Sequence, residues 1–524
     1  MKERNKFRWV AFLPPAALLV AAIVINIVNE DLLINVFTIL NNLFMERLGW
    51  MASLLTVIAF VLLLVCCVTP FGNIRLGGKD AKPTMGTFNW FCITLTNTIA
   101  SGILIWGFCE PIYHLADPAT AITGIEPMSG AASKFALETM FMHWALLPYA
   151  IYCIPAVVFG FMIYNAKAKY SVSSQLAPML GKANTPVVQQ IVDAVLLFCI
   201  GVGMAACFGQ GLVNMVGCSD ALFGTGFSNF WLFVFAAVIG AISIFTAITG
   251  VDKGVKVAAR VNVYGYAFVF CFILFLGPTS YILGLGTESI GGYITHFFER
   301  GMATGTSVGS NWPQSWTTFY WASWMSWAPT TGMFLASISY GRKIKEMILM
   351  ILGGCSACAI IMTSIMSGTA IHTQLTGAAD VLGAMNTNGL GAGPYAVLRT
   401  LPGSTILLVV LIVVIVLTLV TAVNGNIIAM SGLSHEKAQT ETGKDVTPWY
   451  TKLIWGVIIA AMAYIAMALL GGYDGIKTMS NIGGICAAFL MIGICGSCAV
   501  LIIKYRKFDA VDGGAEAEND GRES

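Results

Sequence analysis

About twelve stretches of this chain are apolar over a length that can cross a lipid bilayer, and no other feature restricts the fold as much. Their approximate limits are 8–28, 51–71, 87–114, 139–165, 187–215, 229–250, 254–283, 312–340, 346–368, 402–431, 450–471 and 481–503. A helix needs about 20 apolar residues to span the hydrocarbon core, where backbone polar groups must be bonded within the protein. Only 10% of the residues are charged, against about 25% in soluble domains. We therefore expect an all-α polytopic membrane protein with about 12 transmembrane helices.

The distribution of Lys and Arg predicts the orientation of these spans, because cytoplasmic loops are enriched in both residues. If the N-terminus is cytoplasmic, the cytoplasmic loops and both tails hold 23 of the 28 basic residues. The opposite side holds Arg47, Lys134, Arg300, Arg399 and Lys477. This predicts a multi-pass protein of the cell inner (plasma) membrane, with both termini cytoplasmic and a retained first span rather than a cleaved signal peptide.

Four segments outside the spans have recognisable character. Residues 30–48 and 287–302 are amphipathic and predict helices in the membrane interface. Residues 369–400 form the longest outside loop and contain several turn-forming glycines. Residues 508–524 are acidic and rich in small residues, which predicts a disordered tail.

Composition argues against several classes of function. A net charge of +2 gives no sign of a nucleic-acid partner. The paired cysteines lack the neighbouring His or second Cys pair of a zinc site, so we expect reduced thiols, no metal and no cofactor. A membrane-embedded enzyme needs a nucleophile–base pair or a metal cluster, and the histidines are scattered, at His114, His143, His296, His372 and His435. A membrane ligand sensor is an alternative, although the spans leave no room for a large soluble signalling domain.

The eighth span carries a stripe of aromatic side chains. Trp316, Tyr320, Ser323, Trp324 and Trp327 recur at i, i+4, i+7, i+8 and i+11, so they lie on one helical face. The faces of indole and phenol rings attract cations without any acidic residue. A quaternary ammonium suits such a surface best, because it is charged but has no N–H to donate.

The alternative is that these rings belong to an interfacial belt or to the packed core. A belt is shallow, whereas the stripe spans about 16 Å at helical rise and reaches toward the middle of the bilayer. Beyond it, Pro329 and Gly332 predict a break or bend in the helix.

Two other spans place aromatic and ionisable residues at a similar depth. Span four carries the sequence His143-Trp144 and then Tyr149 and Tyr152, and span three carries the sequence from Trp106 through Glu110 to Tyr113. Three helices could therefore contribute to one aromatic cage. The ionisable residues inside spans are Glu110, His143 and Asp193, with Glu138 near an end. They suit a transport path or proton relay, or else a helix cap or an interhelical hydrogen bond. No intramembrane Arg or Lys stands ready for an anionic ligand group.

These residues resemble the signature of the betaine/carnitine/choline transporter family. The resemblance is carried by Trp316-Thr-Thr-Phe-Tyr-Trp-Ala-Ser-Trp-Met-Ser-Trp327 and by its continuation Gly332-Met-Phe-Leu-Ala-Ser-Ile-Ser-Tyr-Gly-Arg342. It is supported by Trp106-Gly107 with Glu110-Pro111, by His143-Trp144 and by Lys253-Gly254, and it covers essentially the whole chain.

The resemblance implies a fold in which spans three to twelve form two inverted five-helix repeats, with alternating access and commonly a homotrimer. The corresponding domain limits are 1–83 for two N-terminal helices and an interfacial helix, 84–285 for the first repeat, 286–507 for an interfacial helix and the second repeat, and 508–524 for the tail. It also implies the residues of the substrate site. These are Tyr113, Trp144, Tyr149, Tyr152 and Trp324 around the aromatic cage, and Trp316, Tyr320 and Trp327 on the pathway.

Several positions depart from the family pattern. Ser323 precedes Trp324 where members usually have two tryptophans, and Tyr149 replaces a usual Trp. An Arg is lost at Ser337, where members have Ala-Arg-Ile-Ser. The glycine-rich stretch of span three, typical of choline and betaine importers, corresponds here to Ala100 through Gly102.

The residues that resemble coupling positions are also altered. The Thr-Ser pair of sodium-driven members corresponds to Thr421-Ala422, which removes one hydroxyl ligand for a hard cation. The Arg of carnitine-type exchangers corresponds to Asn262, with Arg260 two residues earlier. We therefore expect a secondary transporter of trimethylammonium compounds such as betaine or carnitine, working as an exchanger (antiporter) or by sodium-independent uptake. The alternative is a sodium-coupled betaine/choline symporter, with Na⁺ as the coupling ion.

Overall fold

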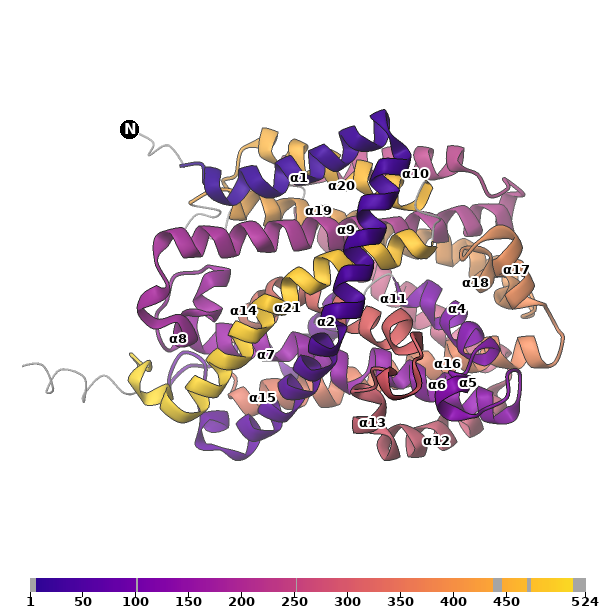
Figure 1. Cartoon of the computed structure of the whole chain (residues 1–524), viewed down its shortest axis with the longest axis horizontal. Helices are drawn as coiled ribbons and strands as arrows, with labels where there is room; N and C mark the ends of the chain where they lie inside the picture. The colour runs from indigo at the N-terminus through magenta and orange to yellow at the C-terminus, as the bar shows by residue number, and fades with distance from the viewer. Residues whose placement is uncertain (1–5, 100–101, 251, 437–444, 469–472, 512–524) are drawn as a thin grey trace, which may run out of the picture.

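The computed structural model describes residues 6–99, 102–250, 252–436, 445–468 and 473–511 (Figure 1). Within these ranges the chain is built from helices, and β pairing is limited to two isolated bridges, between Phe7 and His435 and between Arg75 and Lys343. The predicted all-α class of a polytopic membrane protein is confirmed.

Nine helices in the described residues are long and apolar enough to cross a membrane, and the number rises to eleven if each of two bent helix pairs is one span. The Trp-rich helix α14 (Phe319–Ser337) is not among them, since its indole, hydroxyl and small side chains lower its hydropathy. The count of twelve and the inverted repeats therefore stay predictions.

The first two helices differ from the expected pattern at one place. Helix α1 (Trp9–Val28) ends at Asn29, whose side chain accepts a hydrogen bond from the N–H of Leu32 and so caps α2 (Glu30–Val68). Because nothing interrupts α2, residues 30–48 are the first half of one continuous helix. Their location in the interface stays a prediction.

The third predicted span consists of two helices, α3 (Thr87–Thr98) and α4 (Ile103–Ala116), inclined at 59°. Gly102 is the residue before α4 and is buried. The candidate residue Ala100 lies outside the described residues.

Two groups of helices pack side by side in the molecule (Figure 1). Around the long helix α9 (Pro186–Phe223) lie α1, α19 (Ser404–Leu433) and α20 (Trp449–Ala468). Helix α10 (Asn229–Thr249) packs on both α19 and α20. Helix α11 (Asp252–Leu276) packs on α19. A second group is formed by α4, α6 (Gly130–Trp144), α12 (Thr279–Thr295) and α16 (Ser356–Leu375), the last of which continues from α15 (Ile344–Ile348) through a π-helical turn. Helix α2 crosses α21 (Tyr473–Lys504).

Both segments that were expected at the membrane surface, 287–302 and 369–400, contain helices. The residues 287–302 belong to α12 and to α13 (Phe297–Gly301), and α12 turns by 103° from the helix before it. The outside loop 369–400 contains the end of α16 and two short helices, α17 (Val381–Asn388) and α18 (Ala392–Leu398).

Helix α14 packs most extensively against α7 (Leu146–Tyr164) and α21. Glycines permit this close approach: a Cβ at Gly332 would lie 2.7 Å from Pro155, and one at Gly484 would lie 1.9 Å from the carbonyl oxygen of Ala322. Helix α14 continues through Pro329 to Ser337 without a break, and the alternative of a bend at this position stays a prediction. The side-chain amide of Gln175 donates a hydrogen bond of 3.1 Å to the carbonyl oxygen of Pro329.

Candidate functional site

The candidate site lies where α4, α6, α7 and α14 meet. Helix α6 ends at Trp144, and α7 starts at Leu146 after Ala145 leaves the helical conformation with φ −111° and ψ −119°. Helix α14 is preceded by one π-helical turn, Gln314–Thr318. Such turns are rare and change the direction of side chains within a helix. The sequence suggested one uninterrupted span over 139–165.

Trp324 is the centre of an aromatic cluster. Its ring centroid lies 4.7 Å from that of Tyr152, 5.8 Å from that of Tyr149 and 5.9 Å from that of Trp144. All four side chains are buried. Residues that the sequence placed on different spans are therefore in ring contact, and a cation placed among them would meet aromatic surface from two helices and the turn between α6 and α7.

A second group of rings continues from this cluster. Tyr320 lies 5.6 Å from Trp144 and 6.3 Å from Trp106, and Trp106 lies 6.3 Å from Trp316. Tyr113 joins at the far end, with its ring 5.6 Å from that of Trp316. Along these contacts several rings lie between Tyr113 and Trp324, and a place for Tyr113 in the wall of the cage stays a prediction. Trp106, which links the two groups, was noted in the sequence but not chosen as a site residue.

The remaining stripe positions face other helices. A Cβ at Gly203 of α9 would lie 3.4 Å from the indole of Trp327, so Trp327 packs beside α9. Ser323 is half-buried, and its carbonyl oxygen accepts a hydrogen bond of 2.7 Å from the Ser326 hydroxyl.

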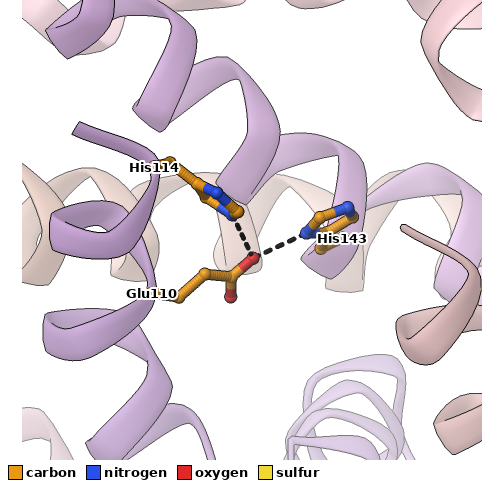
Figure 2. Close-up of side chains that lie close together, drawn as sticks. All are labelled: Glu110, His114 and His143. Carbon is orange, nitrogen blue, oxygen red and sulfur yellow. Dashed lines mark hydrogen bonds and ion pairs between the residues drawn. The ribbon is translucent and has the colours of Figure 1, made fainter. Parts of the chain in front are cut away.

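Behind the aromatic cluster lies a buried carboxylate, Glu110, flanked by two histidines (Figure 2). Its Oε1 lies 2.6 Å from Nδ1 of His143 and 3.1 Å from Nε2 of His114. Its Oε2 accepts a hydrogen bond of 3.0 Å from Nε1 of Trp144 and another from the Tyr320 hydroxyl. All five side chains are buried. We call Glu110, His114 and His143 the carboxylate–histidine cluster.

This cluster corrects one sequence-based argument. His114 and His143 were expected to be scattered, but their rings lie 5.8 Å apart on one carboxylate. The spacing of Glu110 and His114 at i and i+4 places both on one face of α4 and could have indicated part of the cluster. The position of His143, which comes from α6, could not be inferred from spacing.

The three side chains of the cluster also have the ligand types of a metal site, with one atom from each within 4.8 Å of the others. Hydrogen bonds from both rings to Glu110 Oε1 account for these distances. The expectation that the protein holds no metal stays a prediction.

Two other buried charges have structural partners. Asp193 on α9 binds Arg8 at 2.5 Å, which attaches the start of α1 to α9. Glu138 on α6 binds Arg300 on α13 at 2.8 Å. For Asp193 the alternative of an interhelical hydrogen bond is confirmed.

Lys477 is a cation that sequence reasoning missed as a site residue. It was assigned to the outer loop, but its Nζ lies 3.8 Å from the ring centroid of Trp316 and 2.5 Å from the carbonyl oxygen of Ser315. The aromatic path therefore includes a lysine amine of the protein itself beside Trp316.

The coupling candidates lie on three different helices. Asn262 on α11 donates to the Thr418 hydroxyl of α19 at 2.8 Å. The Thr421 hydroxyl, one turn further along α19, donates to the carbonyl oxygen of Leu417 at 2.8 Å. Gly102 lies beside Gln210 of α9, whose Oε1 would be 2.7 Å from a Cβ at that position.

A cavity of about 500 Å³ between α6 and α13 includes His143 of the carboxylate–histidine cluster in its lining. Its polar lining includes Lys134, Glu138, Thr139, His143, His296, Arg300 and Thr317. The Thr317 hydroxyl is 3.1 Å from Nε2 of His143, so the cavity ends at a hydrogen bond of the cluster.

Comparison with known proteins gives a consistent result. A model of the betaine/carnitine/choline family of transporters matches residues 10–507. The ectoine/hydroxyectoine transporter of Virgibacillus pantothenticus is 26% identical over 459 residues, which cover 88% of this chain and 89% of that protein. The glycine betaine transporter OpuD of Bacillus subtilis (strain 168) is 28% identical over 484 residues, covering 92% and 90%. Glycine betaine transporter 1 of Vibrio parahaemolyticus is 26% identical over 454 residues, covering 86% and 84%.

Proposed function

The chain belongs to the betaine/carnitine/choline family of membrane transporters, and on this basis we propose that it carries a small zwitterion with a quaternary ammonium group, such as glycine betaine or carnitine. The protein is a transporter and not an enzyme. The substrate class is proposed from the ring contacts that Trp324 makes with Trp144, Tyr149 and Tyr152. Each desolvated contact between a cation and an aromatic ring contributes about 2 kcal/mol.

Transport by alternating access fits the way these rings are packed. At centroid separations of 4.7 to 5.9 Å the rings contact one another. An ammonium group can enter the cage only when Trp324 separates from at least one partner. Because Trp144 lies at the turn between α6 and α7, a small change of angle at Ala145 would open that wall.

We infer exchange or sodium-independent uptake as the mode of coupling. The hydroxyl of Thr421 is bonded within its own helix, and Asn262 is bonded to Thr418. Neither arrangement supplies the several oxygen ligands of a hard cation. Sodium-coupled symport of betaine or choline is the alternative, with Na⁺ as a coupling ion. We also propose a homotrimer with both termini in the cytoplasm.

A second candidate substrate is ectoine, which has N–H groups on its cationic ring. The cage offers phenol hydroxyls from Tyr149 and Tyr152, one of them at a position where family members usually have Trp. Hydroxyl groups accept N–H donors, which indole rings do not.

The test is flux of labelled glycine betaine and of labelled ectoine into proteoliposomes, with and without a sodium gradient and with and without internal substrate. Uptake that needs internal substrate and not sodium supports exchange. Sodium-dependent uptake into empty vesicles would contradict it. Binding without flux would favour a membrane sensor.

A further inference from the structure

Glu110 is surrounded by groups that can all donate hydrogen bonds. A carboxylate has about four lone-pair positions, and Glu110 has four partners: the rings of His114, His143 and Trp144 and the Tyr320 hydroxyl. Trp144 can only donate. The arrangement is therefore that of an ionised carboxylate with two neutral histidines, which leaves one negative charge behind the aromatic cage.

The two histidines differ in the hydrogen bonding of the ring nitrogen that faces away from Glu110. Nδ1 of His114 is buried and has no hydrogen-bond partner among the described residues. Nε2 of His143 lies 3.1 Å from the Thr317 hydroxyl. A hydroxyl donates to a neutral imidazole nitrogen and accepts from a protonated one simply by rotating. His143 can therefore gain a proton at Nε2 without losing a hydrogen bond, whereas a proton on His114 would have no acceptor.

His143 is also the member of the cluster whose side chain lines a cavity. Its side chain and that of Thr317 line the polar cavity of about 500 Å³. Within this cavity lining, the Thr317–His143 hydrogen bond is the contact that leads directly to Glu110.

His143 also stacks on Tyr320, which is a proposed substrate-contacting residue. The rings of His143 and Tyr320 are stacked, with centroids 4.5 Å apart and planes inclined at 16°. A protonated His143 is therefore a cation on the face of Tyr320, and it neutralises the charge of Glu110. Both effects oppose a second cation in the neighbouring cage.

We propose that Nε2 of His143 is a proton-binding site, and that this proton and the ammonium group of the substrate compete for the negative charge of Glu110. A proton from the cavity adds to His143 and forms an imidazolium paired with Glu110. When the ammonium group enters the cage, the same proton leaves to water. This inference depends on the proposed function, because it requires the cage to bind a cation.

Other titratable groups also lie near the cluster. On α4 the titratable neighbours are Cys109 and Tyr113, and on α6 and α13 they are Glu138 and Arg300, which are paired with each other. On α21 they are Asp474 and Lys477. Lys134, His296 and Glu299 also line the cavity with Glu138 and Arg300, and Lys134, His296 and Arg300 all lie within 3.7 Å of the Glu138 carboxylate. His143 is the histidine of this lining that contacts Glu110, and for this reason we assign the exchanging proton to His143.

The experiment measures equilibrium binding of labelled glycine betaine to the purified full-length protein between about pH 5.5 and pH 8.5, the range in which histidine titrates. Glycine betaine keeps both of its charges throughout. The apparent Kd is expected to rise as the pH falls, approaching tenfold per pH unit. In weak buffer with an indicator dye, binding is expected to release up to one proton per betaine.

Matched variants distinguish loss of the proton-binding site from a general loss of folding or substrate binding. His143→Asn keeps an N–H near the position of Nδ1 but cannot be protonated, so it is expected to abolish the pH dependence and the proton release. His114→Gln keeps the N–H that faces Glu110 and is expected to retain both. Thr317→Val leaves a protonated His143 without an acceptor and is expected to shift the pH midpoint to lower pH, whereas Thr317→Ser is expected to leave it in place.

Each outcome has one meaning. Binding that is independent of pH in the unaltered protein, without proton release, overturns the proton site while leaving the proposed function intact if Trp324→Ala abolishes that binding. No betaine binding at any pH overturns the proposed betaine function. Loss of the pH dependence in His114→Gln, together with its retention in His143→Asn, would place the proton on His114 and overturn the proposal.

Discussion

Nε1 of Trp144 donates a hydrogen bond of 3.0 Å to Oε2 of Glu110, while the face of the same indole lies against Trp324. One side chain therefore connects a buried negative charge to an aromatic surface. Donation of the N–H to a carboxylate leaves more electron density on the indole ring, which strengthens its attraction for a cation. The carboxylate–histidine cluster and the cage are best considered as one unit.

Trp324→Ala is expected to abolish uptake of glycine betaine while the protein still inserts into the membrane. It removes the ring that Trp144, Tyr149 and Tyr152 share, and loss of one good contact of about 2 kcal/mol lowers affinity more than tenfold. Uptake into proteoliposomes measures the effect. Trp449→Ala is the control, because Trp449 is exposed at the start of α20. Normal uptake by Trp324→Ala would contradict the cage.

Lys477→Met is expected to shift selectivity from glycine betaine toward choline by about tenfold. The ammonium over Trp316 repels a substrate that is only cationic and attracts the carboxylate of a zwitterion. Competition between the two labelled compounds for uptake measures the ratio. Lys477→Arg keeps the charge and should keep the ratio, and an unchanged ratio in Lys477→Met would exclude a role in selectivity.

Gly292→Ala is expected to lower the thermal stability of the protein in detergent by several degrees. A Cβ at Gly292 would lie 1.6 Å from Oε1 of Glu138, so the carboxylate must move away from Arg300. Overpacking of this kind costs about 1 to 3 kcal/mol. Gly291→Ala is a matched control on the same helix, because a Cβ there meets nothing within 4 Å. Equal melting temperatures for the two variants would show that Glu138 relocates freely.

Arg8→Met is expected to destabilise the protein by about 3 to 5 kcal/mol, because it leaves the buried Asp193 carboxylate uncompensated. The double variant Arg8→Met with Asp193→Leu is expected to recover much of this loss, since no unpaired charge remains. Thermal unfolding of the single and double variants measures the interaction energy. Additive losses would mean that the ion pair contributes nothing beyond its separate side chains.

Much of the architecture could be predicted from the chain alone. Apolar length is a local property that led to an all-α membrane protein, and the Trp-rich signature over 316–327 led to the correct family. The aromatic stripe was also predictable, because helical periodicity places Trp316, Tyr320 and Trp324 on one face. Two local features could not be predicted, because they depend on neighbouring helices. One is the interruption at Ala145 between α6 and α7, and the other is the unbroken course of α14 through Pro329.

The site divides in the same way. Which side chains could bind a cation followed from the sequence, because the π-rich faces of Trp and Tyr are intrinsic to the residues. Which of them meet was decided by tertiary structure: Tyr149 and Tyr152 surround Trp324, Tyr113 lies several rings away, and His143 from α6 joins Glu110 from α4. The physical reason is that periodicity specifies a face within one helix, whereas contact between helices depends on crossing positions set by glycine packing, breaks and turns.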